Sequence, residues 1–186
     1  MLILASQSPR RQEILATAGI NFVVRPADVD EGRLGDESPE AHVRRLARAK
    51  AESITPGAGE WVLGADTVVV VDGDILGKPS GVEDAEKMLR RLSGREHFVL
   101  TGICLRSRDA EVVDVESTRV HFVPLTDDDI RAYVASGEPD DKAGAYAIQG
   151  LASRFIDRIE GCYFNVVGLP ISLVYRRLKE LSVPLG

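Results

Sequence analysis

The chain has 186 residues, 44% of them hydrophobic and 28% charged, which is typical of a folded globular protein and excludes a disordered or collagen-like one. Acidic residues number 29 against 23 lysines and arginines. The net charge of -6 argues against duplex nucleic acid as a partner, so any phosphate site must be local. No run is long and apolar enough to span a membrane, and no export leader opens the chain. We expect a cytoplasmic protein with one domain over residues 1–186.

The first half of the sequence begins with the order strand, helix, strand, helix. The expected elements are a buried strand over 2–5, a helix from Ser8-Pro9 to about Gly19, a strand over 22–25, an acidic loop over 28–37, and a helix opened by Ser38-Pro39. A valine-rich stretch over 61–71 is the most strand-like segment, and Asp72-Gly73 is a strong hairpin signal after it.

The second half mixes strands and helices. Thr126 and Asp129 form a capping-box pattern at the start of a helix. The expected elements are a helix around 85–92 that Gly94 ends, strands over 98–106 and 112–123, a helix over 126–136, short strands over 156–159 and 163–167, and a terminal helix from about Pro170.

The segment Ser6-Gln7-Ser8-Pro9-Arg10-Arg11 joins the first strand to the first helix. Such a junction offers free backbone N–H groups and the positive end of a helix dipole to an anion. The hydroxyls of Ser6 and Ser8 and the guanidinium groups of Arg10 and Arg11 add donors that match phosphate oxygens. The segment is therefore a candidate phosphate site. The alternative is that Ser8 only caps the helix and that the arginines are solvated.

Lys50 falls on the apolar face of the helix that begins at Pro39, in step with Val43, Leu46 and Ala47. An unpaired buried charge is costly, so Lys50 should either meet an anion or extend its stem to water.

Asp66 lies inside an otherwise apolar strand, 62–71, with Thr67 as the other polar residue. A carboxylate there must be hydrogen-bonded, paired, metal-bound or shifted in pKa, and each of these suits a catalytic acid, base or ligand. The alternative is a structural aspartate bonded to nearby backbone.

Two further segments offer weaker candidates. Gly77-Lys78-Pro79 holds a second lysine on a turn with limited backbone freedom. The stretch 144–150 is rich in small residues and ends in Gln149-Gly150, as expected where backbone and a side-chain amide approach a flat ligand such as a base. An ordinary tight loop explains the second stretch equally well.

Metal ligands other than oxygen are not indicated. The three histidines are far apart in sequence and lack metal-ligand spacing, so a metal would be bound by oxygen, and Glu31 is the loop carboxylate that we select for this role. Cys104 and Cys162 each lie in an apolar stretch, as small buried hydrophobes do.

Motifs spread over the chain resemble one family when they are taken together. They are Ser6-x-Ser8-Pro9-Arg10-Arg11, Gly64-Ala65-Asp66-Thr67, Gly77-Lys78-Pro79, Leu92-Ser93-Gly94, Asp141-Lys142-Ala143-Gly144-Ala145-Tyr146 and Val166-Val167-Gly168-Leu169-Pro170. From Leu2 to about Leu178 the sequence resembles the Maf nucleotide pyrophosphatases, also called septum formation inhibitor proteins. The resemblance implies an α/β fold similar to the inosine triphosphate pyrophosphatases, with an elongated mixed sheet bent around a central cleft, flanking helices, and a homodimer.

The resemblance also implies roles for individual residues. Asp66 matches the family's proton acceptor. Ser6, Ser8, Arg10, Glu31, Lys50 and Lys78 match the triphosphate and metal region. Arg10, Thr67 and Gln149 match positions that set base preference in the branch acting on dTTP and UTP.

The residues and the resemblance favour one mechanism, in which a nucleoside triphosphate is hydrolysed to the monophosphate and pyrophosphate. A divalent cation, Mg²⁺ or Mn²⁺, bridges phosphate oxygens and the carboxylates of Glu31 and Asp66, while Asp66 activates the water. Two alternatives stay open: a nucleotide-sensing regulator of cell division, and a member of the same family that acts on a methylated guanine nucleotide.

Overall fold

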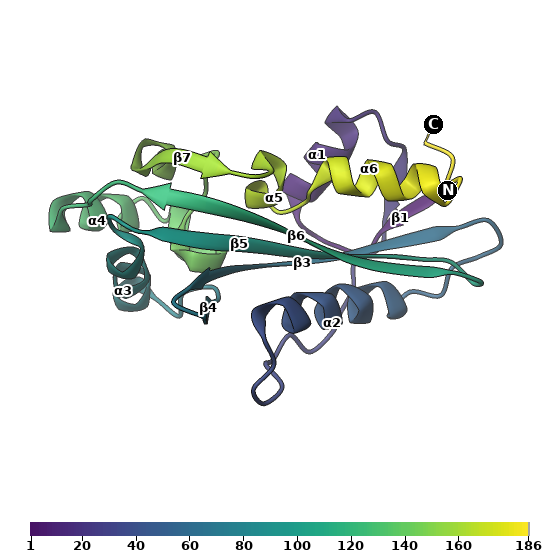
Figure 1. Cartoon of the computed structure of the whole chain (residues 1–186), viewed down its shortest axis with the longest axis horizontal. Helices are drawn as coiled ribbons and strands as arrows, with labels where there is room; N and C mark the ends of the chain where they lie inside the picture. Colours follow the sequence, from purple (N-terminus) through teal and green to yellow (C-terminus); the bar gives the residue numbers. More distant parts are fainter. Residues whose placement is uncertain (186) are drawn as a thin grey trace. The chain divides into compact units, whose positions relative to one another are not determined.

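One mixed β-sheet organises the chain, whose residues 1–185 are described by a computed structural model (Figure 1). The strands are β1 (Leu2–Leu4), β2 (Phe22–Val24), β3 (Trp61–Val71), β4 (Asp74–Leu76), β5 (Glu96–Arg106), β6 (Glu111–Phe122) and β7 (Ile156–Glu160). The α-helices are α1 (Pro9–Thr17), α2 (Pro39–Glu52), α3 (Val82–Leu92), α4 (Asp127–Val134), α5 (Tyr163–Val167) and α6 (Ile171–Glu180). Short 3-10 helices are η1 (Glu138–Asp141), η2 (Ala143–Ala145) and η3 (Leu151–Phe155).

The sheet combines parallel and antiparallel pairs. Its strands are hydrogen-bonded in the order β2-β1-β3-β5-β6-β7, and β4 pairs with β3. β1 is parallel to both β2 and β3, with Ile3 opposite Val23 and Val62. The β3–β4 and β6–β7 pairs are antiparallel. The predicted α/β class is confirmed.

The chain forms two compact units, and each is made of separate segments. The first unit contains Met1–Thr67, Thr101–Glu116 and the chain from Gly168 on, and the second contains Val68–Leu100 and Ser117–Val167. The long strands β3, β5 and β6 contribute residues to both units.

In the first unit, helices cover both faces of the strands, with α2 on one face and α1 and α6 on the other (Figure 1). Alternation along β1 explains this arrangement, because successive strand side chains point to opposite faces. Ile3 belongs to a buried cluster with Ala47 and Ala51 of α2. Ser38 caps α2, since its Oγ accepts a hydrogen bond from the backbone N–H of Ala41 at 3.2 Å.

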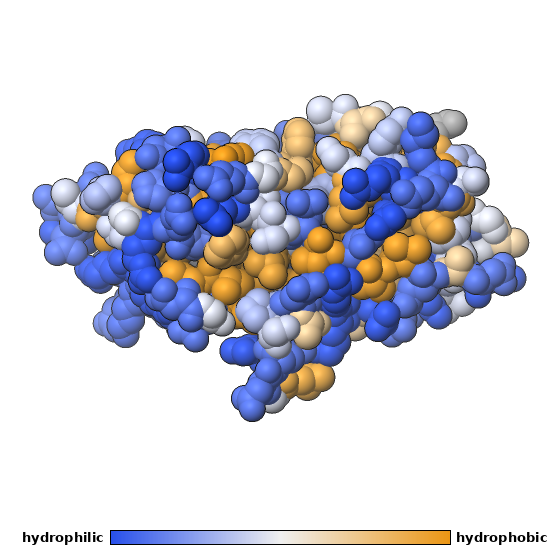
Figure 2. Space-filling model, in the orientation of Figure 1, coloured by the Kyte–Doolittle hydropathy of each residue, from blue (hydrophilic) through white to orange (hydrophobic). Residues whose placement is uncertain are grey.

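Aromatic rings pack against one another within the largely aliphatic core of the second unit. Phe122 meets Tyr146 in a T-shaped contact with ring centroids 4.9 Å apart, and Tyr133 meets Phe155 edge-on at 5.4 Å. Both tyrosine rings are buried. The surface over α3 and α4 is mostly hydrophilic (Figure 2). These helices therefore bury one face and present charged side chains on the other.

The structure contradicts the predicted strand over 163–167, which forms helix α5 instead. Asn165 lies within this segment and is fully buried. Its Nδ2 donates to the carbonyl of Val99 at 2.8 Å and to the hydroxyl of Thr118 at 3.0 Å. These tertiary hydrogen bonds outweigh the strand propensity of a short tyrosine- and valine-containing run. The other predicted strands and helices are found, with ends shifted by a few residues.

Within residues 1–185, no helix has the length and apolar character needed to cross a bilayer. Both cysteines are free thiols, and burial raises the pKa of Cys104 to about 12, so its thiol stays protonated and unreactive near neutral pH.

A buried histidine makes stability depend on pH. His97 is 1% exposed, and its Nε2 lies 2.8 Å from the Tyr146 hydroxyl. Burial lowers the pKa of His97 to about 4, and the nearby His121 adds a smaller effect in the same direction. In the unfolded chain the histidine pKa is roughly 6.5. The stabilising contribution is therefore fully present above about pH 6.5 and is lost as the pH falls toward 4.

We expect the free energy of unfolding to fall by on the order of 3 kcal/mol from this source between pH 6.5 and pH 4. Urea unfolding at several pH values measures the effect. The variant His97→Gln should show a flatter profile, because glutamine does not titrate, whereas His121→Gln on the surface should keep most of the wild-type slope. Equal slopes in wild type and His97→Gln would contradict this explanation.

Candidate active site

Lys50 lies between two carboxylates in the first unit. Its Nζ is 2.7 Å from Oδ1 of Asp66 and 2.6 Å from Oε1 of Glu31. The side chains of Lys50 and Asp66 are each only 10% exposed, whereas Glu31 is 55% exposed. Of the two outcomes expected for Lys50, contact with an anion or extension to water, the structure shows the first, and the anion is supplied by the chain itself.

The close approach of α2 to the sheet explains how Lys50 reaches Asp66. A Cβ on Gly64 would lie 2.1 Å from the carbonyl oxygen of Ala47, and one on Gly102 would lie 2.3 Å from another carbonyl oxygen of α2. Only glycine allows backbones to come so near. Gly64 and Asp66 are two residues apart on β3, so the side chain of Asp66 points to the same face of the strand, the one on which α2 approaches Gly64.

The loop that carries Glu31 is tied to α2 by an arginine that sequence reasoning did not select. Arg45 donates to the carbonyl of Gly32, the residue after Glu31, at 2.8 Å. It also donates to both carboxylate oxygens of Glu37, at 2.6 and 2.9 Å, and His42 Nδ1 lies 2.6 Å from the same carboxylate. The hydrogen bond from Arg45 holds the pKa of the Glu37 carboxyl far below its ordinary value. This cluster fixes the backbone beside Glu31.

Arg11 donates hydrogen bonds to both sequence neighbours of Asp66, to the backbone of Ala65 and to the side chain of Thr67. Its Nη1 donates to the carbonyl of Ala65 at 2.9 Å, its Nη2 donates to the Thr67 hydroxyl at 3.1 Å, and its Nε donates to the carbonyl of Gly168 at 2.9 Å. Burial lowers the pKa of the Arg11 guanidinium, and the carboxylates of Asp66 and Glu31 oppose that shift. Arg11 therefore lies within electrostatic reach of both carboxylates.

The junction between β1 and α1 keeps its hydrogen-bonding capacity. The Oγ of Ser6 accepts from the backbone N–H of Ser8 and from Nη1 of Arg11, both at 3.2 Å, and its own proton can still be donated. Ser8 occupies the N-cap position, but within the described residues its side chain makes no capping bond. The alternative that Ser8 only caps the helix therefore does not hold for its side chain. Pro9 has no backbone N–H and that of Gln12 donates to the carbonyl of Ser8 at 3.3 Å, so the backbone N–H groups of Arg10 and Arg11 are the candidate donors to an anion in this turn. Arg10 follows in that turn and is partly exposed.

The second unit supplies the two remaining predicted residues. Lys78 is exposed on the turn after β4, and the carbonyl of its neighbour Gly77 accepts from the backbone N–H of Gly144 at 3.0 Å. Gly144 has a φ of 68°, and a Cβ there would lie 2.8 Å from Val69, so only glycine fits this position. Gln149, which follows in the same loop, has an exposed side chain. The lysine turn and the glutamine loop are therefore joined through their backbones.

Glu31 and Asp66, the two carboxylates that contact the ammonium of Lys50, are the candidate ligands for a divalent metal. Among residues 1–185, no group of three or more histidines, cysteines, aspartates or glutamates is placed to hold a metal ion. Mg²⁺ fits this limit, because it commonly takes one or two protein carboxylates and completes its shell with water and substrate phosphate oxygens. The oxygen donors of Glu31 and Asp66 meet that requirement.

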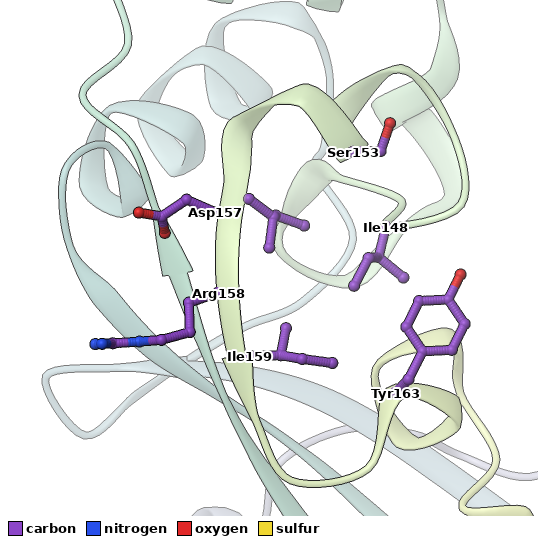
Figure 3. A pocket seen from close by; sticks show the side chains of 7 residues that line it. Ile148, Ser153, Asp157, Arg158, Ile159 and Tyr163 are labelled. Atoms are coloured by element: carbon purple, nitrogen blue, oxygen red, sulfur yellow. The ribbon is translucent and has the colours of Figure 1, made fainter.

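A pocket of about 370 Å³ on the second unit is unsuited to a triphosphate (Figure 3). It is lined by Ile148, Ser153, Ile156, Asp157, Arg158, Ile159 and Tyr163. Its charged residues are already paired, Asp157 with His121 at 2.5 Å and Arg158 with Glu96 at 3.5 Å. The side chains of Asp157 and Arg158 point away from Ile148 and Tyr163 (Figure 3). None of the predicted site residues is among those that line this pocket.

Known proteins resemble the chain over nearly its whole length. A family model described as Maf-like protein matches residues 1–181. A protein of Geotalea uraniireducens named dTTP/UTP pyrophosphatase is 53% identical over 184 residues, which cover 97% of this chain and 95% of the relative. A protein of the same name from Symbiobacterium thermophilum is 52% identical over 187 residues and covers 99% of this chain and 95% of the relative.

Solved structures resemble the fold at much lower sequence identity. A HAM1 protein from Coxiella burnetii has a TM-score of 0.54 and 16% identity, with 96% of this chain and 98% of that one covered. The Ham1 protein of Staphylococcus aureus has a TM-score of 0.52 and 16% identity, with coverage of 97% and 98%. These likenesses concern the fold alone.

Proposed function

Because the chain belongs to the Maf-like family, as its motifs predicted, we propose that it hydrolyses nucleoside triphosphates, dTTP and UTP in preference to others, to the monophosphate and pyrophosphate. The names of its relatives support this activity. The observation that carries the mechanism is Asp66, a buried carboxylate on β3 that Lys50 and Arg11 surround with positive charge.

Asp66 acts as the general base. It accepts a proton from a water molecule whose oxygen attacks the α-phosphorus. The bond from that phosphorus to the bridging oxygen breaks, and pyrophosphate leaves with the bonding electron pair. The carboxylate suits this role because β3 fixes its position and because Arg11 holds the residues before and after it, Ala65 and Thr67.

Positive groups offset the charge that develops on the departing pyrophosphate. We assign this role to Arg10, Lys50 and Lys78, with the hydroxyls of Ser6 and Ser8 and the first turn of α1 as further donors. Arg11 contributes mainly by positioning, because most of its N–H donors are bonded to the protein.

A divalent cation, Mg²⁺ or Mn²⁺, would be held by Glu31 and Asp66. Bound there, it would polarise phosphate oxygens and lower the charge repulsion that opposes attack. Lys50 already bridges the two carboxylates, so its ammonium balances their charge when no second cation is present.

Base preference is assigned to Gln149, with Thr67 and Arg10 as contributors. A pyrimidine such as thymine or uracil presents a carbonyl and an imide N–H on one edge, and a single amide can donate to the first and accept from the second. An unmatched polar edge costs roughly 1 to 3 kcal/mol, so we expect dTTP and UTP to be preferred over ATP and GTP by about tenfold or more in kcat/KM.

Steady-state pyrophosphate release from dTTP, UTP, CTP, ATP and GTP, with and without Mg²⁺, measures this preference. The variant Gln149→Ala should lose most of it. Equal rates on purines and pyrimidines would remove the base-reading role, whereas tight nucleotide binding without any turnover would favour the alternative of a nucleotide sensor.

Three broader features complete the proposal: one functional domain over the chain, a homodimer, and a place of action in the cytoplasm, where nucleoside triphosphates are abundant. Light scattering coupled to size-exclusion chromatography measures the oligomeric state directly.

A further inference from the structure

Two hydrogen bonds hold the backbone on either side of Gln149. The backbone N–H of Ala147 donates to the hydroxyl of Tyr133 at 3.2 Å, and the backbone N–H of Leu151 donates to Oε2 of Glu138 at 3.0 Å. The two acceptors are themselves joined, because the Tyr133 hydroxyl donates to Oε1 of Glu138 at 2.8 Å. The side chains of Tyr133 and Glu138 thus form one bridge, which accepts hydrogen bonds from the backbone two residues before and two residues after Gln149.

The bridge is rigidly placed within the second unit. Tyr133 is fully buried, and its ring packs edge-on against Phe155. A Cβ on Gly150 would lie 2.2 Å from Oε2 of Glu138, so the loop backbone rests directly on the carboxylate. Both oxygens of Glu138 are engaged by different donors. The backbone of the loop therefore has little freedom to shift at this point.

Gln149 is more exposed to solvent than its two sequence neighbours. Its side chain is exposed, and within residues 1–185 its amide forms no hydrogen bond with the protein. An exposed amide of this kind is hydrogen-bonded by water and stays available to a ligand. A fixed backbone beneath an unengaged amide is the arrangement expected for reading a ligand edge, since preorganisation lowers the cost of binding.

We propose that Tyr133 and Glu138 are positioning residues that set base preference by fixing the loop that carries Gln149. The inference rests on the proposed base-reading role of Gln149. Neither residue binds phosphate or activates water in the mechanism above. Loss of the bridge should therefore reduce the preference for dTTP and UTP while hydrolysis of ATP stays nearly constant.

The test compares kcat/KM for dTTP and ATP in wild type and variants, with Mg²⁺ present. Tyr133→Phe removes the hydroxyl and leaves the ring, so the preference for dTTP should fall about tenfold. Glu138→Ala should act likewise. Glu138→Gln should keep most of the wild-type preference, because the amide oxygen can accept from the backbone N–H of Leu151 and the amide nitrogen can donate to the phenol oxygen of Tyr133.

A matched control is Tyr175→Phe, the same chemical change at a tyrosine that is exposed on α6 in the first unit. It should keep the wild-type ratio. Thermal unfolding of each variant shows whether the fold is retained, and if Tyr133→Phe does not fold, the pair Glu138→Ala and Glu138→Gln decides in the same assay.

Two results would overturn the inference while leaving the proposed function intact. One is an unchanged dTTP to ATP ratio in folded Tyr133→Phe and Glu138→Ala when Gln149→Ala has lost it. The other is an equal loss for both substrates, which would mean that the bridge is only structural. A wild type without pyrimidine preference would instead overturn the base-reading proposal and this inference together.

Discussion

Replacing Asp66 by asparagine should lower kcat by about a thousandfold, because it removes the group that accepts the proton from water. The fold should survive. Asparagine keeps an oxygen that can accept from Lys50, which lies 2.7 Å from the present carboxylate, and Lys50 keeps its contact with Glu31. Nucleotide binding should persist for the same reason, since the phosphate donors are unchanged. Single-turnover kinetics and nucleotide titration by calorimetry measure the two quantities separately.

Asp128→Asn is a suitable control for this experiment, because it makes the same change in charge at a side chain that is 92% exposed on α4. Its activity should match that of wild type. If Asp66→Asn kept activity within a few-fold of wild type, the general-base assignment would be wrong and the carboxylate would have a structural or metal-binding role only.

Replacing Lys50 by methionine should destabilise the protein by about 3 kcal/mol, because it leaves the buried carboxylate of Asp66 without its ammonium partner. Methionine fills a similar volume on the apolar face of α2, so the loss of stability would come from the missing charge and not from poorer packing. Activity should fall as well, since Lys50 also offsets charge on the leaving pyrophosphate. Urea unfolding at neutral pH measures the stability, and Lys87→Met at an exposed site on α3 is the control.

The double variant Lys50→Met with Asp66→Asn distinguishes charge from packing. Removing the stranded carboxylate should recover more than half of the stability that Lys50→Met loses. A double variant no more stable than Lys50→Met would show that the ion pair is not the source of the effect.

Much of this site could be predicted because burial of a charge is visible in a sequence. Lys50 falls on the apolar stripe of a helix, and Asp66 interrupts an apolar strand, so each required a partner before either contact was known. The structure joins them to each other and to Glu31. Local signals at Ser38, Asp72-Gly73 and the Thr126 capping box likewise gave the correct helix and turn positions.

What could not be predicted depends on contacts between distant segments. Arg45 reads as a solvated helix residue, and only the folded loop brings Gly32 and Glu37 to it. No sequence motif indicates that Tyr133 and Glu138 accept hydrogen bonds from the loop of Gln149. The helix at Tyr163–Val167 was missed because the buried hydrogen bonds of Asn165 outweigh local propensity.

The central claim is that water attacks the α-phosphorus, and hydrolysis of dTTP in water enriched in oxygen-18 tests it most directly. Mass spectrometry of the products locates the label. The mechanism predicts thymidine monophosphate carrying one oxygen-18 atom together with unlabelled pyrophosphate, and neither product should form at a comparable rate with Asp66→Asn. Label in the pyrophosphate, or formation of the diphosphate and inorganic phosphate, would contradict it.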